Sequence, residues 1–339
     1  MTGRTNAGRP VDTRPAPALP VGGGLLLVDK PSGCTSHDVV GRLRHVLRTR
    51  RIGHAGTLDP MANGLLVLAV DRSTKLLGHL ALTDKTYLAT IRLGQQTDTD
   101  DADGQVVSAS AVAASSVDAV TDQDIAAGMA ALTGPLLQVP SSVSAIKVDG
   151  RRAYDRVRAG ETVELAARPV TVSRFEILGE PRRLSLDGGR QAVVDLDVAV
   201  DCTTGTYIRS LARDLGAALA VGGHLIKLRR TVVGPFDVTA SVDVFGSGAG
   251  PGTDVPKPPV TEDFAASIAS CVIPAAAAVR LAFPTRTIED AQAIALGHGR
   301  TIEPAGISGT YGAFGPDGAL IALVAERDGH GRSVLGWQT

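Results

Sequence analysis

The chain has 339 residues, a formal net charge of −1, and 44% hydrophobic against 20% charged residues. This length suits about two domains, and the composition excludes a wholly disordered or collagen-like protein. No apolar run reaches the roughly 18 residues of a membrane-spanning helix, which predicts that the protein does not enter a membrane. Three widely spaced cysteines without a C-x-x-C pair indicate a reduced, cytoplasmic protein and give no metal signature.

The first half of the chain opens with a proline- and arginine-containing segment, residues 1–23, that predicts a disordered tail. The predicted elements that follow are a strand at 25–31, a helix capped by residues 35–38, a strand at 65–70, a short helix near 73–80 and a strand at 85–94. Tyr87 falls on the apolar face of the last of these strands.

Residues 98–104, DTDDADG, are a candidate calcium loop. An EF-hand needs an acid at alternate positions before the glycine and a glutamate six residues after it. Thr99 and Ser110 occupy two of those positions, so the pattern fails. The segment is better interpreted as an Asp-rich turn.

The second half of the chain mixes capped helices with alternating strands. Its predicted elements are a helix at 121–132, an irregular basic segment at 139–168 with a short helix near 153–158, strands at 170–178 and 192–201, a glycine turn and helix at 202–219, and a strand at 224–236. A Gly/Pro-rich linker over 246–262 precedes a short helix capped by Thr287 and Asp290, and then a hairpin at 312–324.

The stretch GHAGTLDPMANGLL, residues 53–66, carries the strongest chemical signal. It places Asp59 between glycines and Pro60, ahead of a buried strand that would hold the loop rigidly. Polar loops on rigid strands are where catalytic groups usually lie, although an isolated Asp-Pro is more often a simple Asx turn. Asp59 is therefore a candidate catalytic carboxylate, and the other residues of the chain decide between catalysis and a simple turn.

The sequence contains no phosphate-binding, dinucleotide-binding, zinc-protease or serine-nucleophile motif, so it predicts neither a cofactor nor a metal. A lone carboxylate can act as nucleophile or base without either. It needs a cation to stay ionised in a desolvated pocket, and a guanidinium such as that of Arg209 fits best. Tyr87, Tyr207 and His54 are further candidates, because aromatic rings suit a planar substrate such as a nucleobase.

Five segments together resemble the bacterial tRNA pseudouridine-55 synthases of the TruB type. They are LLLVDKPSGCTS (25–36), RRIGHAGTLDPMANGLL (50–66), KTYLATIRLGQQTDTDDADG (85–104), QVPSSVSAIKVDGRRAYDRVRAG (138–160) and GTYIRSLARDLG (205–216), followed by HLIKLRRTVVGPF. They occur in the family's order. The resemblance implies that Asp59 is the essential aspartate, that Tyr87 packs on the target base and that Arg209 pairs with the aspartate. His54 and Tyr207 match pocket residues, and Lys30 belongs to a motif near the site.

The resemblance also implies an α/β (α+β) pseudouridine-synthase fold: a mixed, largely antiparallel sheet flanked by helices, with a central RNA-binding cleft. The expected organisation is a catalytic domain at 24–245 with an RNA-clamping insertion at 138–160, the linker at 246–262, and a small, mostly β, PUA-like domain at 263–339. The implied partner is the T-arm of tRNA, with no obligate protein partner and a monomeric enzyme. Base flipping would bring the uridine to Asp59.

Separate groups of basic residues suit the phosphates of that RNA, because the potential that attracts a polyanion is local. The residues expected to contact RNA are Arg51, Lys147, Arg151, Arg152, Lys227, Arg229 and Arg230. Solvated helix faces would show the same pattern.

Two other functions compete with this interpretation. An RNA-binding or tRNA-folding protein with incidental catalysis would share the basic groups and the C-terminal module, but would not need an Asp59–Arg209 pair. A phosphotransferase with Asp59 as acceptor usually needs Mg²⁺ and further carboxylates beside the nucleophile, and residues 53–64 supply none.

Overall fold

The computed structural model describes residues 14–107, 117–141, 165–189, 191–246 and 258–337, and the backbone of 147–148 and 151–152. The helices are α1 (Ser36–Val46), α2 (Leu77–Leu80), α3 (Asp122–Ala131), α5 (Ile208–Ala218), α6 (Glu262–Ser270), α7 (Ala275–Ala282) and α8 (Asp290–Gly297). The strands are β1 (Gly24–Lys30), β2 (Ile52–His54), β3 (Asn63–Val70), β4 (Lys85–Leu93), β5 (Gly134–Gln138), β6 (Lys147–Val148), β7 (Arg151–Arg152), β8 (Arg168–Ile177), β9 (Arg182–Leu186), β10 (Gln191–Cys202), β11 (Gly223–Val233), β12 (Phe236–Asp237), β13 (Ile273–Pro274), β14 (Thr285–Thr287), β15 (Thr310–Phe314), β16 (Leu320–Arg327) and β17 (His330–Gly336).

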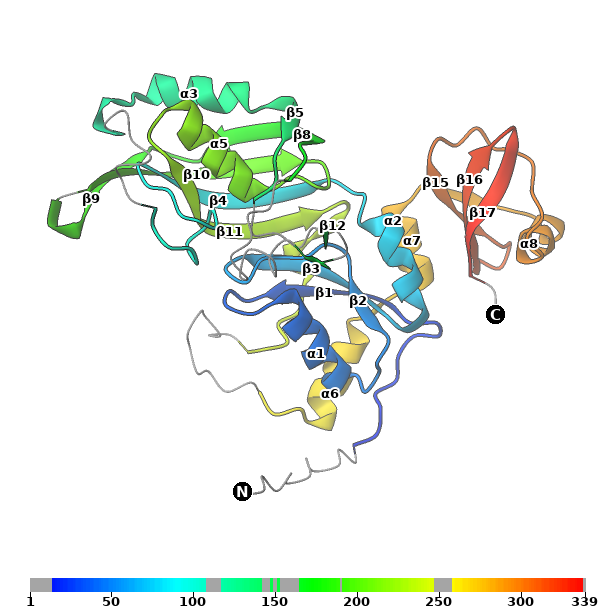
Figure 1. Cartoon of the computed structure of the whole chain (residues 1–339). Helices are drawn as coiled ribbons and strands as arrows, with labels where there is room; N and C mark the ends of the chain where they lie inside the picture. The colour runs from blue at the N-terminus through cyan, green and yellow to red at the C-terminus, as the bar shows by residue number, and fades with distance from the viewer. Residues whose placement is uncertain are drawn as a thin grey trace.

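One large sheet dominates the molecule (Figure 1). Among the described residues it has eleven strands, in the order β13-β1-β3-β11-β4-β10-β8-β5, with β2, β12 and β9 attached to β3, β11 and β10. Its strand pairs are antiparallel except for a short parallel contact in which Arg229 and Arg230 of β11 lie opposite Asn63 and Gly64 of β3. The predicted mixed, largely antiparallel sheet flanked by helices is therefore confirmed.

Alternate residues of β1 face opposite layers, which explains its unbroken apolar run. Leu26 and Val28 pack with α1 and α6, whereas Leu25 and Leu27 pack with α7. On the other half of the sheet, α3 and α5 cover the apolar face of β4 and β10. Each half thus has its own core, and β3 and β11 join the halves.

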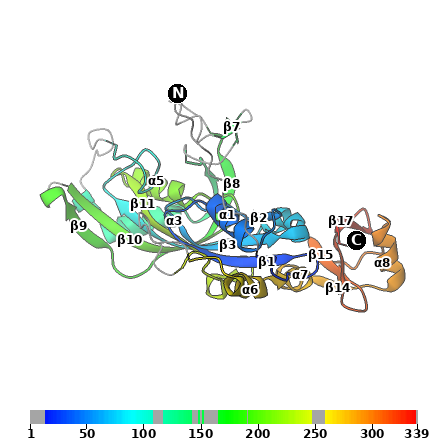
Figure 2. The same cartoon turned by 90° about the horizontal axis from the view of Figure 1, so that it is seen from below.

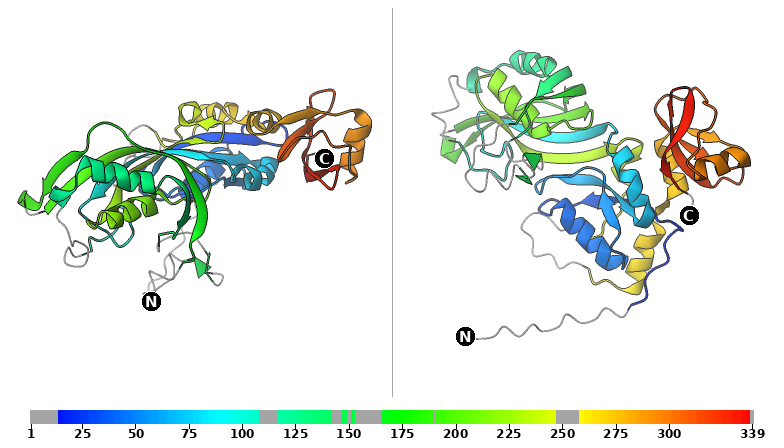
Figure 3. Two further views of the ribbon diagram at one scale, coloured as in Figure 1. Left: turned by 90° about the horizontal axis from the view of Figure 1, so that it is seen from above. Right: turned by 45° about the vertical axis from the view of Figure 1, so that its right-hand side comes forward.

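The C-terminal module is smaller than the expected 263–339. The expected boundary falls inside α6, which packs with α1, and β13 pairs with β1 of the large sheet. The separate four-stranded sheet, β14-β15-β16-β17, begins only at Thr285. It lies at one end of the molecule, as Figures 2 and 3 show. The Gly/Pro-rich segment before α6 suggested a domain boundary there, but α6 and α7 pack against the large sheet.

Several local predictions are confirmed at residue level. Thr35 and Asp38 form a reciprocal capping box at the start of α1, and Tyr87 is buried in β4. The helix that Thr287 and Asp290 were expected to cap is α8. It begins at Asp290, and Glu289 is its N-cap. The short helix expected near 153–158 lies outside the described residues. No helix in the described part of the chain is both long and apolar enough to cross a membrane.

Candidate active site

Two residues hold the Asp59 loop in place: Lys30, at the end of β1, and Ser36, at the start of α1. The buried Lys30 ammonium donates to the carbonyl oxygens of Cys34, 2.7 Å away, and Pro60, 3.3 Å away. The Ser36 hydroxyl donates to the Leu58 carbonyl at 3.1 Å and accepts from the Leu58 amide at 2.9 Å. These bonds bracket Asp59 on both sides, so its carboxylate has little freedom.

Arg209 meets that carboxylate from the first turn of α5. Its Nε lies 3.0 Å from Oδ2 of Asp59, and its Nη2 donates to Oδ1 at 3.3 Å. The arginine side chain is 4% exposed and the aspartate side chain 35% exposed, so the arginine is enclosed while the carboxylate remains accessible beside the pocket. Burial raises the pKa of Asp59, and the charge of Arg209 opposes that rise. The carboxylate pairs with a guanidinium, which is not the arrangement of a simple Asx turn.

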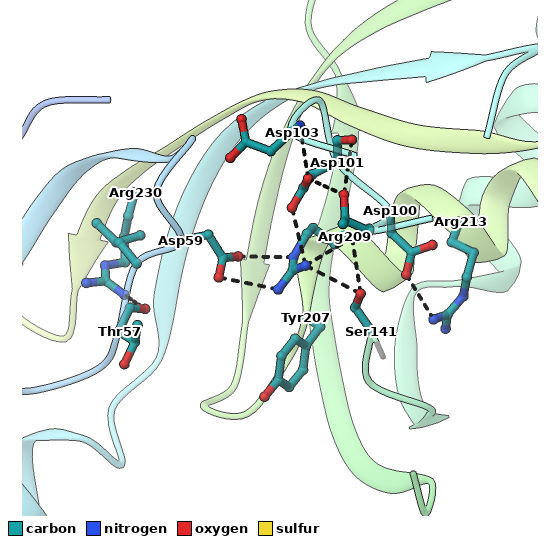
Figure 4. Close-up of polar contacts among 12 residues, drawn as sticks. Thr57, Asp59, Asp100, Asp101, Asp103, Ser141, Tyr207, Arg209, Arg213 and Arg230 are labelled. Atoms are coloured by element: carbon teal, nitrogen blue, oxygen red, sulfur yellow. Dashed lines mark hydrogen bonds and ion pairs between the residues drawn. The ribbon is translucent and has the colours of Figure 1, made fainter. Parts of the chain in front are cut away.

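A second carboxylate, that of Asp101, contacts Arg209 on the side away from Asp59, as Figure 4 shows. Nη1 of Arg209 lies 3.2 Å from Oδ2 of the buried Asp101. The same nitrogen donates to the Thr99 carbonyl at 3.0 Å and to the Ser141 hydroxyl at 3.4 Å. These contacts use the rear edge of the guanidinium and leave the Nε–Nη2 edge facing Asp59. Asp101 therefore orients the arginine.

Sequence reasoning missed this role of the Asp-rich turn. Its Asp100 pairs with Arg213, 3.3 Å away, and its Asp101 pairs with Arg209. The turn is therefore real, but two of its carboxylates are buried against arginines one helical turn apart on α5. That i, i+4 spacing was the available signal, because such residues lie on one helix face.

A pocket of about 250 Å³ opens beside the ion pair. Its walls come from the Asp59 loop, β4, β11 and the start of α5, with Tyr87 and Tyr207 among its lining residues. Tyr207 is the N-cap residue of α5, and its backbone N–H donates to the Gln138 side chain at 2.8 Å. The volume lies just under the ~300–1,000 Å³ of pockets for drug-sized ligands, so it suits a single nucleobase.

The structure thus brings Asp59, Arg209, Tyr87 and Tyr207 into one pocket and separates the other candidates from it. Lys30 lies beneath the loop, and burial lowers its pKa to about 8. His54 ends β2 outside the pocket lining, and burial lowers its pKa as well, which favours the neutral ring. Both positions suit support of the loop.

The expected RNA-contacting residues occupy different environments. Arg51 and Lys227 are exposed, whereas Arg229 forms a two-point ion pair with Asp29 at 3.0 and 2.6 Å. Arg230 is only 1% exposed, and its guanidinium donates to loop carbonyls inside the site. Arg230 is therefore not the surface residue that was expected to contact RNA phosphates, because its side chain lies inside the protein. The side chains of Lys147, Arg151 and Arg152, on the β6–β7 hairpin, lie outside the described residues.

Comparisons with known proteins first identify the class. Residues 44–208 match the TruB family pseudouridylate synthase N-terminal domain, residues 209–244 the tRNA pseudouridylate synthase B C-terminal domain, and residues 283–337 the tRNA pseudouridine synthase II C-terminus. The fold is also that of a chain in the crystal structure of a Cbf5-Nop10-Gar1 complex, with 24% identity, a TM-score of 0.63, and coverage of 96% of this chain and 90% of that one. The protein is a pseudouridine synthase, an isomerase.

Full-length relatives then identify the family. The chain is 54% identical over 307 residues to tRNA pseudouridine synthase B of Nocardia farcinica (strain IFM 10152), covering 90% of each protein. It is 52% identical over 316 residues to tRNA pseudouridine synthase B of Rhodococcus jostii (strain RHA1), covering 93% of this chain and 94% of the relative. The chain belongs to the TruB family.

Proposed function

We propose that this protein converts uridine 55, in the TΨC loop of tRNA, to pseudouridine. The observation that carries the proposal is the Asp59–Arg209 pair at the wall of a base-sized pocket. The names of the relatives, tRNA pseudouridine synthase B, support tRNA as the substrate. A loop uridine also suits this recessed pocket, because a loop base costs less to extrude than a paired one.

The reaction breaks the bond between N1 of uracil and C1′ of ribose, turns the base and joins C5 to C1′. The hydrogen released from C5 is balanced by a hydrogen gained at N1, so the product is an isomer. Asp59 acts either as nucleophile at C1′ or as base at C2′, and Arg209 keeps it ionised. Tyr87, which lines the pocket, would receive the flipped base.

RNA docking is proposed for exposed basic residues outside the pocket lining. Arg51 and Lys227 have the exposure that phosphate contacts require. The β6–β7 hairpin supplies Lys147, Arg151 and Arg152 in the segment expected to close over the RNA. Affinity built from such contacts falls as salt concentration rises.

A tRNA-binding or tRNA-folding protein is the competing function, and turnover separates the two. Wild-type protein incubated with an unmodified tRNA transcript should form pseudouridine at position 55, mapped by carbodiimide labelling and primer extension. The Asp59→Asn variant should bind the transcript with little change in affinity and form no pseudouridine. Pseudouridine formation by Asp59→Asn at the wild-type rate would refute the catalytic assignment.

The same assay in EDTA tests the phosphotransferase alternative. Isomerisation as written involves no phosphoryl group, so we expect the single-turnover rate to survive removal of divalent ions once the tRNA is folded. A chemical step that strictly requires Mg²⁺ would favour the phosphotransferase.

A further inference from the structure

Two buried cations, Lys85 and Arg230, line the pocket together with Tyr87. Lys85 and Tyr87 are two residues apart on β4, so both side chains project from the same face of the strand. Arg230 lies directly opposite Tyr87 on the neighbouring strand β11. A Cβ atom placed on Gly56, in the Asp59 loop, would lie 3.5 Å from Nη1 of Arg230 and 3.7 Å from Cε of Lys85. The two cations therefore flank one point of the pocket wall.

Both cations are bound to backbone carbonyls instead of carboxylates. Lys85 donates to the carbonyl oxygens of Thr83 at 2.7 Å and Ala81 at 3.3 Å. Arg230 donates to the carbonyl of Leu65 at 2.8 Å and to those of Gly56 and Thr57. Within the described residues neither forms an ion pair, whereas Arg209 contacts two carboxylates. The Lys85–Arg230 side of the pocket thus carries positive charge that no described carboxylate contacts directly.

Burying a positive charge costs free energy, and a role in the reaction explains why the pocket keeps two of them. When the bond between N1 and C1′ breaks, its electron pair stays with N1, and the charge spreads to O2 and O4 of the detached pyrimidine. Fixed charges in a desolvated site stabilise such developing charge strongly. We propose that Lys85, supported by Arg230, stabilises the negative charge that develops on uracil as it leaves the ribose. The inference rests on the proposed function.

A leaving-group experiment separates this role from simple support of the loop. Fluorine at C5 makes the pyrimidine anion more stable, so a 5-fluorouridine target depends less on a stabilising cation. The Lys85→Gln variant should break the N1–C1′ bond of uridine ~100-fold more slowly than wild type in single turnovers, the effect typical of losing one charge-stabilising donor. On 5-fluorouridine RNA the loss should shrink to about 10-fold, with tRNA affinity unchanged within twofold on both substrates. Lys75→Gln, which neutralises an exposed lysine outside the pocket lining, is the matched control and should show no such difference.

The pH profile supplies a second readout. Burial, followed by the charge of Arg230, lowers the pKa of Lys85 to about 8, while the nearby Cys202 thiol and the charge of Asp84 act more weakly in the opposite direction. The cation is the active form, so the wild-type rate should fall as pH rises through this value. Lys85→Arg keeps its charge at high pH and should retain most of the rate while extending activity to higher pH.

Three results would overturn the inference. They are an equal loss with uridine and 5-fluorouridine in Lys85→Gln, a loss confined to tRNA affinity, and an alkaline limb in Lys85→Arg identical to that of wild type. Thermal unfolding of each variant identifies a folding failure, in which case Lys85→Arg alone carries the test. Wild-type protein that leaves uridine 55 unchanged would instead refute the proposed function, and the role of Lys85 with it.

Discussion

Arg209 and Asp59 are 150 residues apart in the chain, yet Nε of the arginine lies 3.0 Å from Oδ2 of the aspartate. The aspartate comes from a loop between β2 and β3, and the arginine from the first turn of α5. The short parallel contact of β3 with β11 joins the two halves of the sheet that carry them. The site therefore exists only when both halves are folded and joined.

Arg209→Lys should impair isomerisation severely. A lysine keeps the charge but cannot contact Asp59 at two points while also reaching Asp101. We expect a loss of at least ~100-fold in single-turnover rate, the effect of misplacing a reacting group by about 1 Å. Arg213→Lys is the matched control, because Arg213 pairs with Asp100 one turn further along α5 and does not line the pocket. Comparable losses in the two variants would contradict the role given to Arg209.

Asp101→Asn should release the rear edge of the Arg209 guanidinium. The expected result is a lower rate of isomerisation with little change in tRNA affinity, and a loss of about 1.5–3 kcal/mol in the free energy of unfolding, the usual worth of a hydrogen bond to a charged group. Rates, binding curves and urea unfolding provide the three measurements. Asp98→Asn, in the exposed part of the same turn, is the control and should change none of them.

The acid limb of the pH–rate profile should reflect Asp59. In the proposed reaction its ionised form is the active one, and burial raises its pKa. The rate should therefore fall as pH decreases through a value above the ordinary ~3.9 of an aspartate. Single-turnover rates at saturating RNA across acidic pH give this midpoint, provided that the enzyme stays folded over the range. A midpoint at or below the ordinary value would show that Arg209 outweighs burial.

Gly64→Ala should destabilise the junction between the two halves of the sheet. Gly64 has φ of +100°, and an added Cβ would lie 2.2 Å from the Arg230 carbonyl oxygen. The backbone strain alone predicts a loss of about 1–3 kcal/mol in the free energy of unfolding. Gly41→Ala is a matched control of opposite sign: Gly41 lies in α1 with open space around it, so alanine should stabilise by about 0.5–1 kcal/mol. Urea unfolding of both variants checks the pair, and equal effects would refute the steric argument.

Local sequence determined the elements that the site uses. Alternation placed Tyr87 on the buried face of β4, and the Thr35–Asp38 box began α1 where predicted. These features depend on residues within one strand or one helical turn, so periodicity and capping chemistry reveal them. The Asp59 loop was recognisable for the same reason.

Apart from the Asp59–Arg209 pair, which the family resemblance implied, tertiary structure decided which charges meet. Asp101 belongs to a turn that sequence could describe but could not connect to Arg209, and Arg230 and Lys85 look like ordinary basic residues of two strands until β11 and β4 pair. Likewise α6 and α7 joined the catalytic core although the Gly/Pro-rich segment suggested a boundary before them. Pairing between distant segments is set by the burial of whole faces, which no single window of sequence contains, and it fixes the positions of buried charges to within a few ångströms.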